Sequence, residues 1–308
     1  MTAPLLRLGT RGSPLALTQT GLVRDALANA VPALAAPGAI EIVVIKTTGD
    51  VIQDRPLSEA GGKGLFVKEI EEALLQGRID AAVHSMKDMP TAQPPGLTIS
   101  AFLPREDARD VLIAGDLARI DQLPQGAIVG TSALRRKALL LHRRPDLRIV
   151  TLRGNVDTRL AKRADGTVQA TILALAGLNR LGRKGVGTAI PESEMLPAVG
   201  QGAVCIETRA DDARTRDWLA AIHHEATAVC VRAEHAMLVV LDGSCRTPIA
   251  GHAILTDGEL HLRGLIARPD GSQVFATERR GPIAEAAALG RDAGEELRQR
   301  GGPGFFAD

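Results

Sequence analysis

Short apolar runs alternate with helical patterns along the first two-thirds of this chain of 308 residues. Ser13 and Pro14 form a favourable N-cap and N1 pair for the first expected helix. The first unit comprises expected strands at 5–9, 40–46, 81–85 and 97–103 and expected helices at 14–29 and 65–76. Alternation of this kind is typical of α/β domains, in which helices cover a largely parallel sheet.

Two details of this unit follow from residue spacing. The run 40–46 is mostly apolar and rich in β-branched residues, as expected of a strand covered on both faces. In the second expected helix, apolar residues recur at helical spacing, so we expect them to share one buried face. They are Phe66, Ile70, Ala73 and Leu74.

A second unit of the same kind follows. Its expected strands lie at 127–130, 148–152 and 170–175, and its expected helices lie at 133–142 and 155–163. The stretches 104–110 and 196–202 carry charges or Gly and Pro, so we expect hinges there. An apolar run at 203–208 is expected to return to the first sheet, which would give two crossovers and a cleft between two domains.

The last third of the chain has a different pattern. A helical stretch at 226–241 precedes β-like runs at 249–255, 260–267 and 273–277 and a final helix at 282–299. Asp-Gly pairs at 257–258 and 270–271 separate these runs, and such pairs are a strong hairpin signal. We therefore expect a small α+β domain with a three-stranded antiparallel sheet.

Positive charge is concentrated in one stretch, although the formal net charge of the chain is only +1. Residues 128–163 contain ten Lys or Arg against two Asp, a balance of +8 within 36 residues. Such asymmetry suggests an anionic ligand. Aromatic residues make up only 2% of the chain, which disfavours single-stranded nucleic acid because its bases usually stack on aromatic side chains. A smaller polyanion is the expected ligand.

Neither a secretory signal pattern nor an apolar run of about 20 residues is visible, so a cytoplasmic location without a membrane partner is expected. The cysteine spacing matches no disulfide framework or zinc site, and no metal is expected. Cys205 and Cys230 lie in apolar or helical patterns and are expected in the core. Cys245 lies in a loop beside Arg246, which favours the reactive thiolate; the alternative is an unremarkable loop cysteine.

Lys87 and Asp88 stand in the segment HSMKDMP, where the expected strand at 81–85 runs out into a loop. In open α/β sheets, ligands gather at the carboxyl ends of strands. A carboxylate in this position can stabilise a cationic intermediate or transfer protons. The alternative is an exposed ion pair of little consequence, as most isolated surface pairs are.

Two arginine-rich motifs begin where expected strands of the second unit end. One contains Ser132, Arg135 and Arg136, and the other contains Arg153 and Arg159. Free N–H groups at helix N-termini attract anions, and guanidinium groups bind carboxylate or phosphate in a bidentate manner. The alternative is a pair of solvated basic helices, which the placement at strand ends disfavours.

The first unit offers similar groups. Arg11 and Ser13 occupy the corresponding strand-to-helix turn, and Lys63 in a glycine loop could swing over a bound anion. The chain contains no GxxxxGK[ST] sequence, so nucleotide hydrolysis has no support.

Eight segments together resemble the porphobilinogen deaminase family, in family order and over nearly the whole chain. They are LRLGTRGSPLAL (6–17), GGKGLFVKEIE (61–71), AAVHSMKDMP (81–90), GTSALRR (130–136), LRGNVDTR (152–159), AGLNRLG (176–182), LPAVGQGAV (196–204) and LDGSCRTPI (241–249). The resemblance implies a transferase that joins four porphobilinogen molecules head to tail, with loss of ammonia, and releases the linear tetrapyrrole hydroxymethylbilane by hydrolysis. It also implies a dipyrromethane cofactor, bound as a thioether to Cys245, which primes the chain.

The same resemblance implies roles for individual residues. Asp88 is expected to be the catalytic carboxylate and to contact the cofactor, while Lys87 binds an acid side chain and helps to keep Asp88 ionised. The other expected cofactor ligands are Ser132, Arg135, Arg136 and Arg153. The expected substrate ligands are Arg11, Ser13, Lys63, Phe66, Arg153, Arg159, Arg180 and Gln201. Many relatives carry a second serine where this chain has Ala133, so one hydroxyl contact to the cofactor is absent here or replaced by backbone or water.

We therefore expect a monomeric α/β enzyme of three domains, with no nucleic-acid partner. Two doubly wound domains, at 1–103 with 201–222 and at 104–200, are expected to resemble the bilobal periplasmic-binding-protein fold. Their cleft would hold cofactor and substrate, and their relative movement would accommodate the growing product. The small α+β domain at 223–308 would present the cofactor-bearing cysteine.

Two other functions fit part of the pattern. A non-catalytic anion-binding protein of the same architecture would explain the arginines, but neither the loop thiol nor Asp88. A nucleic-acid binder that uses residues 128–163 would bind with a steep salt dependence, and the scarcity of aromatic residues disfavours it.

Overall fold

The computed structural model describes residues 4–51, 64, 66–243 and 247–306. Within this part the chain divides into two compact units. The first contains the described residues of Met1–Arg55, Ala60–Arg105 and Ala203–Ala228, and the second contains those of Glu106–Gly202 and Val229–Asp308. The finer division into three domains, at 1–103 with 201–222, at 104–200 and at 223–308, stays a prediction.

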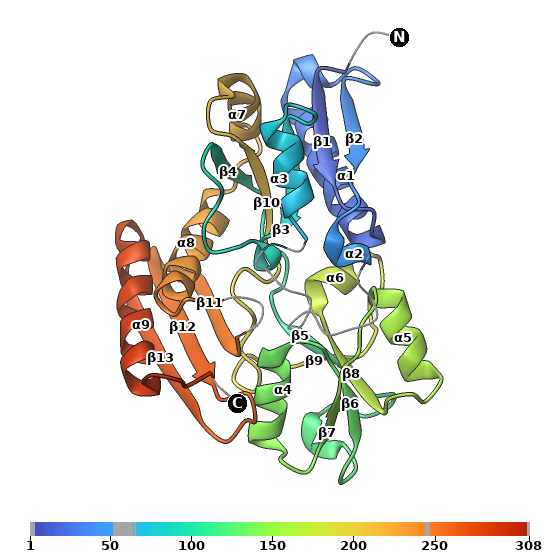
Figure 1. Ribbon diagram of the computed structural model, residues 1–308, viewed down its shortest axis with the longest axis vertical. Coiled ribbons are helices and arrows are strands. Elements are labelled where there is room, and N and C mark those ends of the chain that lie inside the picture. The colour runs from blue at the N-terminus through green and yellow to red at the C-terminus, as the bar shows by residue number, and fades with distance from the viewer. Residues whose placement is uncertain (1–3, 52–63, 65, 244–246, 307–308) are drawn as a thin grey trace. The chain divides into compact units, whose positions relative to one another are not determined.

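A mixed five-stranded sheet with the order β2-β1-β3-β10-β4 forms the centre of the first unit (Figure 1). Its strands are β1 (Leu6–Thr10), β2 (Ile40–Val44), β3 (Ala81–Ser85), β4 (Leu97–Phe102) and β10 (Val204–Arg209). β1 runs parallel to β2 and β3, whereas β10 runs antiparallel to β3 and β4. The run at 203–208 thus returns to the first sheet, which confirms that prediction.

Helices pack on this sheet and complete the unit. They are α1 (Pro14–Ala30), η1 (Pro32–Leu34), α2 (Thr48–Val51), α3 (Lys68–Leu75), η2 (Met86–Asp88) and α7 (Ala213–Ala220), where η marks a short 3₁₀-helix. The hydroxyl of Ser13 accepts a hydrogen bond from the N–H of Ala16 at 3.3 Å, and Pro14 occupies the first turn of α1. This geometry confirms the expected start of α1.

Two expectations for the first unit are wrong. β2 lies at the edge of the sheet with half-buried or exposed residues, because only one of its sides has a neighbouring strand in the described sheet. The helix expected at 65–76 begins only at Lys68, so Phe66 lies in the preceding turn. Ile70 and Leu74 do lie on the buried face of this helix, but Phe66 does not.

The second unit contains a sheet of the same plan, with the order β7-β6-β8-β5-β9. In both sheets, three parallel strands are followed by two strands that each run antiparallel to the preceding one. The elements are β5 (Asp110–Ile113), η3 (Ile120–Gln122), β6 (Ile128–Gly130), α4 (Leu134–Arg143), β7 (Arg148–Val150), α5 (Val156–Ala164), β8 (Ala170–Ala174), α6 (Leu175–Arg180) and β9 (Thr188–Ala189). The sequence patterns did not predict β5 or β9, and the expected hinge at 104–110 ends in the first residue of β5.

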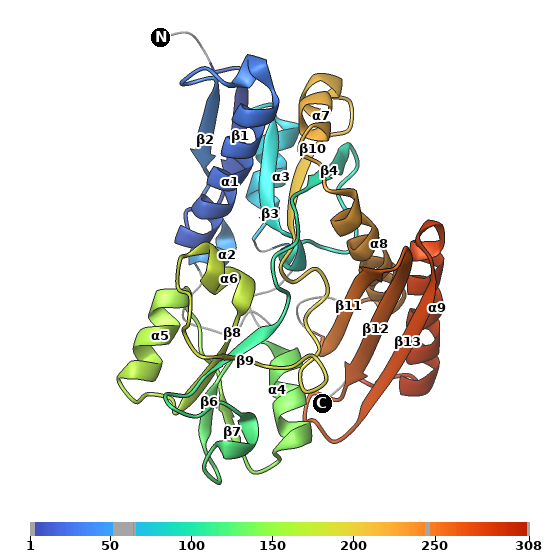
Figure 2. The ribbon, with the colours of Figure 1, turned by 180° about the vertical axis from the view of Figure 1, so that it is seen from behind.

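The C-terminal part of the second unit contains α8 (Glu225–Val240, which begins in the first unit), β11 (Ile249–Thr256), β12 (Glu259–Ala267), β13 (Val274–Pro282), η4 (Ile283–Glu285) and α9 (Ala286–Gly301). β11, β12 and β13 form the expected antiparallel three-stranded sheet, and α9 lies along one face of it (Figures 1 and 2). Asp257 and Gly258 have φ values of 53° and 82°, as the tight turn of a hairpin requires. The expected fold class, with two α/β sheets and a small α+β part, is confirmed.

Two glycines allow α9 to approach α8 closely. A Cβ atom at Gly290 would overlap the carbonyl oxygen of Ala233, and one at Gly294 would lie 2.9 Å from the carbonyl oxygen of Met237. Both obstacles are backbone atoms, which cannot rotate away as the end of a side chain can. The absence of a side chain at Gly290 is therefore a condition for this packing.

Gly290→Ala should lower the free energy of unfolding by about 1–3 kcal/mol, because α9 must move away from α8. Gly21→Ala in α1 is the matched control: its Cβ meets nothing within 4 Å, and it should raise the free energy of unfolding by about 0.5–1 kcal/mol. Urea denaturation of both variants measures the difference. Equal stabilities would contradict the close helix packing.

Candidate active site

Lys87 and Asp88 lie where β3 ends. The chain turns directly from Ser85 into the 3₁₀-helix η2, which is closed by a hydrogen bond from the N–H of Met89 to the carbonyl oxygen of Met86 at 3.1 Å. Lys87 and Asp88 are half-buried, and among the described residues no group donates a hydrogen bond to the Asp88 carboxylate. The acceptor sites of this carboxylate are therefore not used by the described residues.

A buried glutamine of α1 fixes this strand end. Gln19 donates from Nε2 to the Ser85 hydroxyl at 3.0 Å, and that hydroxyl donates to Gln19 Oε1 at 3.1 Å. Sequence reasoning missed Gln19, although a polar residue on the apolar face of a helix was a signal that could have found it. Through Ser85, Gln19 ties α1 to the residues immediately before Lys87.

The first unit contains three further predicted site residues, Arg11, Ser13 and Phe66. Arg11 contacts Phe66, and Ser13 contacts the backbone of α1. The Arg11 guanidinium lies over the Phe66 ring, 4.1 Å from its centroid, which is a cation–π geometry. The Ser13 hydroxyl caps α1. Phe66 therefore orients a cation in this structure instead of filling the face of a helix.

Two predicted site residues, Lys63 and Cys245, lie outside the described residues. The other two cysteines, Cys205 and Cys230, are buried as expected. Burial, together with the charges of Glu207 and Asp88, raises the pKa of the Cys205 thiol, so this cysteine is held in its unreactive form.

Arg135 and Arg136 meet a carboxylate that sequence reasoning did not identify. Asp110, the first residue of β5, is fully buried and accepts hydrogen bonds from both guanidiniums at 2.7 Å. Arg135 also donates to the carbonyl oxygen of Leu196 at 2.7 Å, and Arg136 donates to that of Ile172 at 2.9 Å. We call Arg135, Asp110 and Arg136 the buried arginine cluster.

The buried arginine cluster has an excess of positive charge, because two guanidiniums face one carboxylate. Burial alone would raise the pKa of Asp110, but the charges of the two guanidiniums hold it well below its usual range. Burial lowers the pKa of Arg135, and Asp110 opposes this effect. Such a cluster attracts a further anion.

The sequence predicted Arg135 and Arg136 as donors that face a ligand. In the structure both are buried and bound to groups of the protein. Only 5% of each residue is exposed, and each already holds a carboxylate and a carbonyl group of the protein. Ser132, just before α4, is exposed, and Ala133 caps that helix without a side-chain hydrogen bond. Asp110 opens an apolar run, and a buried carboxylate of this kind requires a cationic partner.

The three other predicted arginines of the second unit lie after a strand, within a helix and at the end of a helix. Arg153 follows β7 and is half-buried, and Arg159 donates from Nε to the carbonyl oxygen of Gly154 at 2.9 Å. Arg180 ends α6 and donates to the carbonyl oxygen of Gly202 at 2.7 Å. Arg180 is half-buried, and burial lowers the pKa of its guanidinium, an effect that the charge of Glu106 opposes.

Gln201 lies beside the buried arginine cluster. Its side-chain amide donates to Asp110 at 2.9 Å and to the carbonyl oxygen of Ala108 at 2.7 Å. Its contacts with the protein therefore support Asp110, while its predicted contact with substrate stays a prediction.

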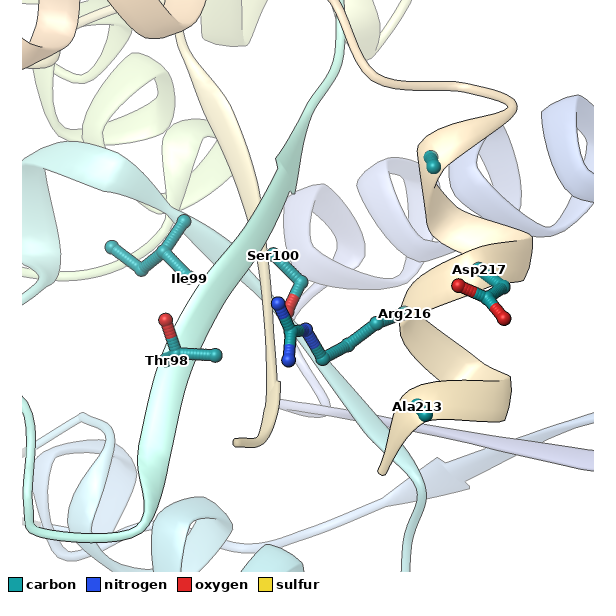
Figure 3. Close-up of a pocket in the computed structure, with 7 residues that line it drawn as sticks. Thr98, Ile99, Ser100, Ala213, Arg216 and Asp217 are labelled. Carbon is teal, nitrogen blue, oxygen red and sulfur yellow. The ribbon is translucent and has the colours of Figure 1, made fainter. Parts of the chain in front are cut away.

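A surface cavity of about 380 Å³ lies between β4 and α7 (Figure 3). Arg216 points across it toward Ser100, and its guanidinium donates to the carbonyl oxygen of Ala210 at 2.9 Å. None of the described residues that the sequence predicted for the site lines this cavity. The position of this cavity therefore gives it no connection with the predicted site residues.

Three buried titratable residues lie in and around β3, the strand that leads to Asp88: His84 on β3 itself, Glu207 on the neighbouring β10 and Glu71 on α3. His84 Nε2 lies 3.2 Å from Glu207 Oε2, and Glu71 of α3 is also buried. Burial, reinforced by the negative charge of Glu207 and opposed by His84, raises the pKa of Glu71 to about 7. Within the described residues, Glu71 Oε1 and both oxygens of Glu207 accept no hydrogen bond.

Two family models match this chain. One, described as the porphobilinogen deaminase dipyromethane cofactor binding domain, matches residues 6–217, and the porphobilinogen deaminase C-terminal domain matches residues 228–299. The chain belongs to the porphobilinogen deaminase family. The family, its transferase activity and its dipyrromethane cofactor, all expected from the sequence, are thereby confirmed.

Individual relatives agree with the porphobilinogen deaminase family models. The porphobilinogen deaminase of Paracoccus denitrificans is 59% identical, over 98% of this chain and 96% of that protein. The chloroplastic porphobilinogen deaminase of Oryza sativa subsp. japonica is 52% identical, over 98% of this chain and 86% of that protein. A periplasmic substrate-binding protein of an ABC transporter from Coxiella burnetii aligns with 72% of this chain and 94% of its own, at 17% identity and a TM-score of 0.42. The fold assignment rests on the strand order described above.

The donor set of the second unit fits the family's dipyrromethane cofactor. Such a group bears acetate and propionate side chains, and several carboxylates together need several cations. The buried arginine cluster has an excess positive charge, Arg153 is half-buried, and Ser132 is an exposed donor near the N-terminus of α4. The attachment residue expected from the family, Cys245, lies outside the described residues.

Asp110→Asn should lower the free energy of unfolding by about 3–5 kcal/mol, because two guanidiniums would remain buried without a counter-charge. Asp121→Asn is the control, since this exposed carboxylate pairs with Arg143 at the surface and its loss should change stability far less. Urea denaturation measures both. A small effect at Asp110 would show that the cluster does not depend on its carboxylate.

Glu71 gives a pH dependence of stability with a defined sign. The unfolded chain releases this proton near the ordinary value of 4.5, whereas the folded protein retains it up to about pH 7. The contribution of Glu71 to stability is thus complete below pH 4.5 and lost as pH rises through 7. Glu71→Gln carries no titrating group, so its stability relative to the wild type should rise by about 2 kcal/mol between about pH 5 and pH 8.

Thermal and urea unfolding of Glu71→Gln across this pH range measure the effect. The matched control is Glu72→Gln, which removes an exposed carboxylate from the next position of the same helix. A stability difference that stays constant with pH for Glu71→Gln would contradict the raised pKa.

Proposed function

We propose that this chain condenses four porphobilinogen molecules into hydroxymethylbilane, with Asp88 as the proton-transferring carboxylate and arginines as ligands of the pyrrole acid groups. The observation that carries this proposal is the half-buried carboxylate of Asp88 at the end of β3, to which no other described residue donates a hydrogen bond. Its acceptor sites remain available, as a group that must exchange protons with a substrate requires.

Asp88 serves two needs of the reaction. Loss of ammonia from porphobilinogen requires a proton for the departing amine, and formation of the new carbon–carbon bond releases a proton from the pyrrole. A carboxylate in reach of both atoms can give the first proton and accept the second. The electron-poor pyrrole that forms between these events is a cation, which an adjacent carboxylate stabilises. Lys87, the preceding residue in the chain, is proposed to bind an acid side chain of the substrate.

The arginines bind instead of reacting. Each pyrrole carries two carboxylates, so a product that lengthens on the enzyme presents about a dozen of them, counting the primer. Arg135, Arg136, Arg153, Arg159 and Arg180 in the second unit, with Arg11 in the first, are proposed to hold these groups. Ser13, Lys63, Phe66, Ser132 and Gln201 are proposed as further contacts.

Cys245 is the proposed attachment residue of the cofactor. When bound, the dipyrromethane supplies the free pyrrole carbon to which the first porphobilinogen is joined. The arginines would hold the carboxylates of this group, and Asp88 would transfer the protons of each condensation. Cys205 and Cys230 are buried, which leaves Cys245 as the attachment site that fits best.

We further propose that the chain acts as a monomer in the cytoplasm, with porphobilinogen as its partner and without nucleic acid or membrane. Among the described residues, no helix is long and apolar enough to cross a membrane. The scarcity of aromatic side chains supports a small polyanion over a nucleic acid.

Asp88→Asn should lower turnover of porphobilinogen by at least about a hundredfold, because the amide neither accepts the pyrrole proton nor balances a cation. Asp25→Asn is the control: this carboxylate is exposed on α1 and pairs with the neighbouring Arg24. Product formation, with circular dichroism to verify folding, measures both variants. Turnover near the wild-type level in folded Asp88→Asn would overturn the mechanism, and wild-type protein that binds porphobilinogen without converting it would favour a simple anion-binding protein.

A further inference from the structure

The loop at 196–202, which precedes β10, contacts two of the arginines proposed to bind carboxylates. Its first carbonyl oxygen, that of Leu196, accepts a hydrogen bond from Arg135 at 2.7 Å. Its last, that of Gly202, accepts one from Arg180 at 2.7 Å. The loop thus binds one terminal nitrogen of each guanidinium. The other nitrogens of these guanidiniums donate no hydrogen bond to the described residues of the loop.

The same loop supports the buried arginine cluster from within. Gln201 donates to Asp110, and Asp110 binds both Arg135 and Arg136. A shift of the loop would therefore move the partners of three arginines at once. The loop acts as a common frame for cations that lie on different helices, α4 and α6.

One buried carboxylate anchors this loop. Glu234 of α8 is fully buried, and its Oε2 accepts a hydrogen bond from the N–H of Gly200 at 2.7 Å. Its Oε1 accepts one from the N–H of Ala253 in β11 at 2.8 Å. Gly200 has a φ of +71°, a conformation that favours glycine and that this hydrogen bond helps to hold. Glu234 thus joins α8, β11 and the loop at 196–202.

We propose that Glu234 is a positioning residue, which fixes the loop at 196–202 and thereby sets the direction in which Arg135 and Arg180 present their guanidiniums to the ligand. Glu234 itself touches no ligand and transfers no proton. This inference rests on the proposed role of the arginines as carboxylate ligands.

The substitution Glu234→Gln tests whether the loop depends on the hydrogen bonds of this carboxylate or only on the volume of the side chain. A glutamine has nearly the same shape, but its amide can accept only one of the two backbone hydrogen bonds through its oxygen. Its NH₂ group then faces a backbone N–H, so two donors oppose each other and one buried N–H loses its partner. The loop at 196–202 is expected to shift while the fold persists.

Steady-state kinetics with porphobilinogen test the proposal. Glu234→Gln should raise KM by about tenfold and change kcat by less than about threefold, because carboxylate binding is disturbed and Asp88 is not. Glu295→Gln, an exposed glutamate of α9, should behave as the wild type. If Glu234→Gln does not fold, Glu234→Asp replaces it: it keeps the charge, shortens the reach by one methylene and should raise KM in the same direction. Wild-type KM in a folded variant of Glu234 would overturn the proposal.

A double-substitution cycle with Arg180→Gln shows whether the effect passes through the loop. If it does, the KM increase of the double variant is smaller than the product of the two single increases. If the increases multiply, Glu234 acts independently of Arg180, and the positioning role is wrong. If Arg180→Gln alone leaves KM unchanged, the proposed binding role of that arginine fails instead, so the two failures are distinguishable.

Discussion

The second unit is organised around one fully buried carboxylate. Asp110 binds Arg135 and Arg136, and these reach on to carbonyl groups of β8 and of the loop at 196–202. A buried carboxylate or guanidinium alone would be strongly unfavourable, so each group depends on the others. Because two guanidiniums face one carboxylate, the cluster has an excess of positive charge, which the carboxylates of the proposed ligand would offset. Asp110 thus allows two arginines to be buried together, because its carboxylate supplies a counter-charge for both guanidiniums.

In each unit, the groups assigned to the chemistry follow the carboxyl ends of parallel strands. β1 leads to Arg11 and Ser13, and β3 leads to Lys87 and Asp88. In the second unit, β6 leads to Ser132, β7 leads to Arg153, and β8 leads through α6 to Arg180. The strand order is the same in both sheets, so one architectural plan places the proposed reacting carboxylate in one unit and most of the arginines proposed to bind carboxylates in the other.

Local patterns in the sequence predicted much of this arrangement. The cap at Ser13, the strand that ends before Lys87 and the hairpin turn at Asp257 each depend on neighbouring residues, whose preferences are visible in the sequence. The misplaced features depend on partners distant in the chain. β2 is apolar but lies at an edge, and Phe66 has a helical spacing but lies over Arg11. The partner of the paired arginines was missed because Asp110 lies 25 residues before Arg135, and only the folded sheet brings them together.

The proposed function depends most directly on a covalent primer held by these cations. Intact mass spectrometry of the purified protein, followed by peptide mapping, tests it without reference to turnover. We expect a mass that exceeds the sequence mass by two linked pyrrole units, with the added mass on the peptide that contains Cys245. A protein with the bare sequence mass, or an adduct on the buried Cys205 or Cys230, would contradict it.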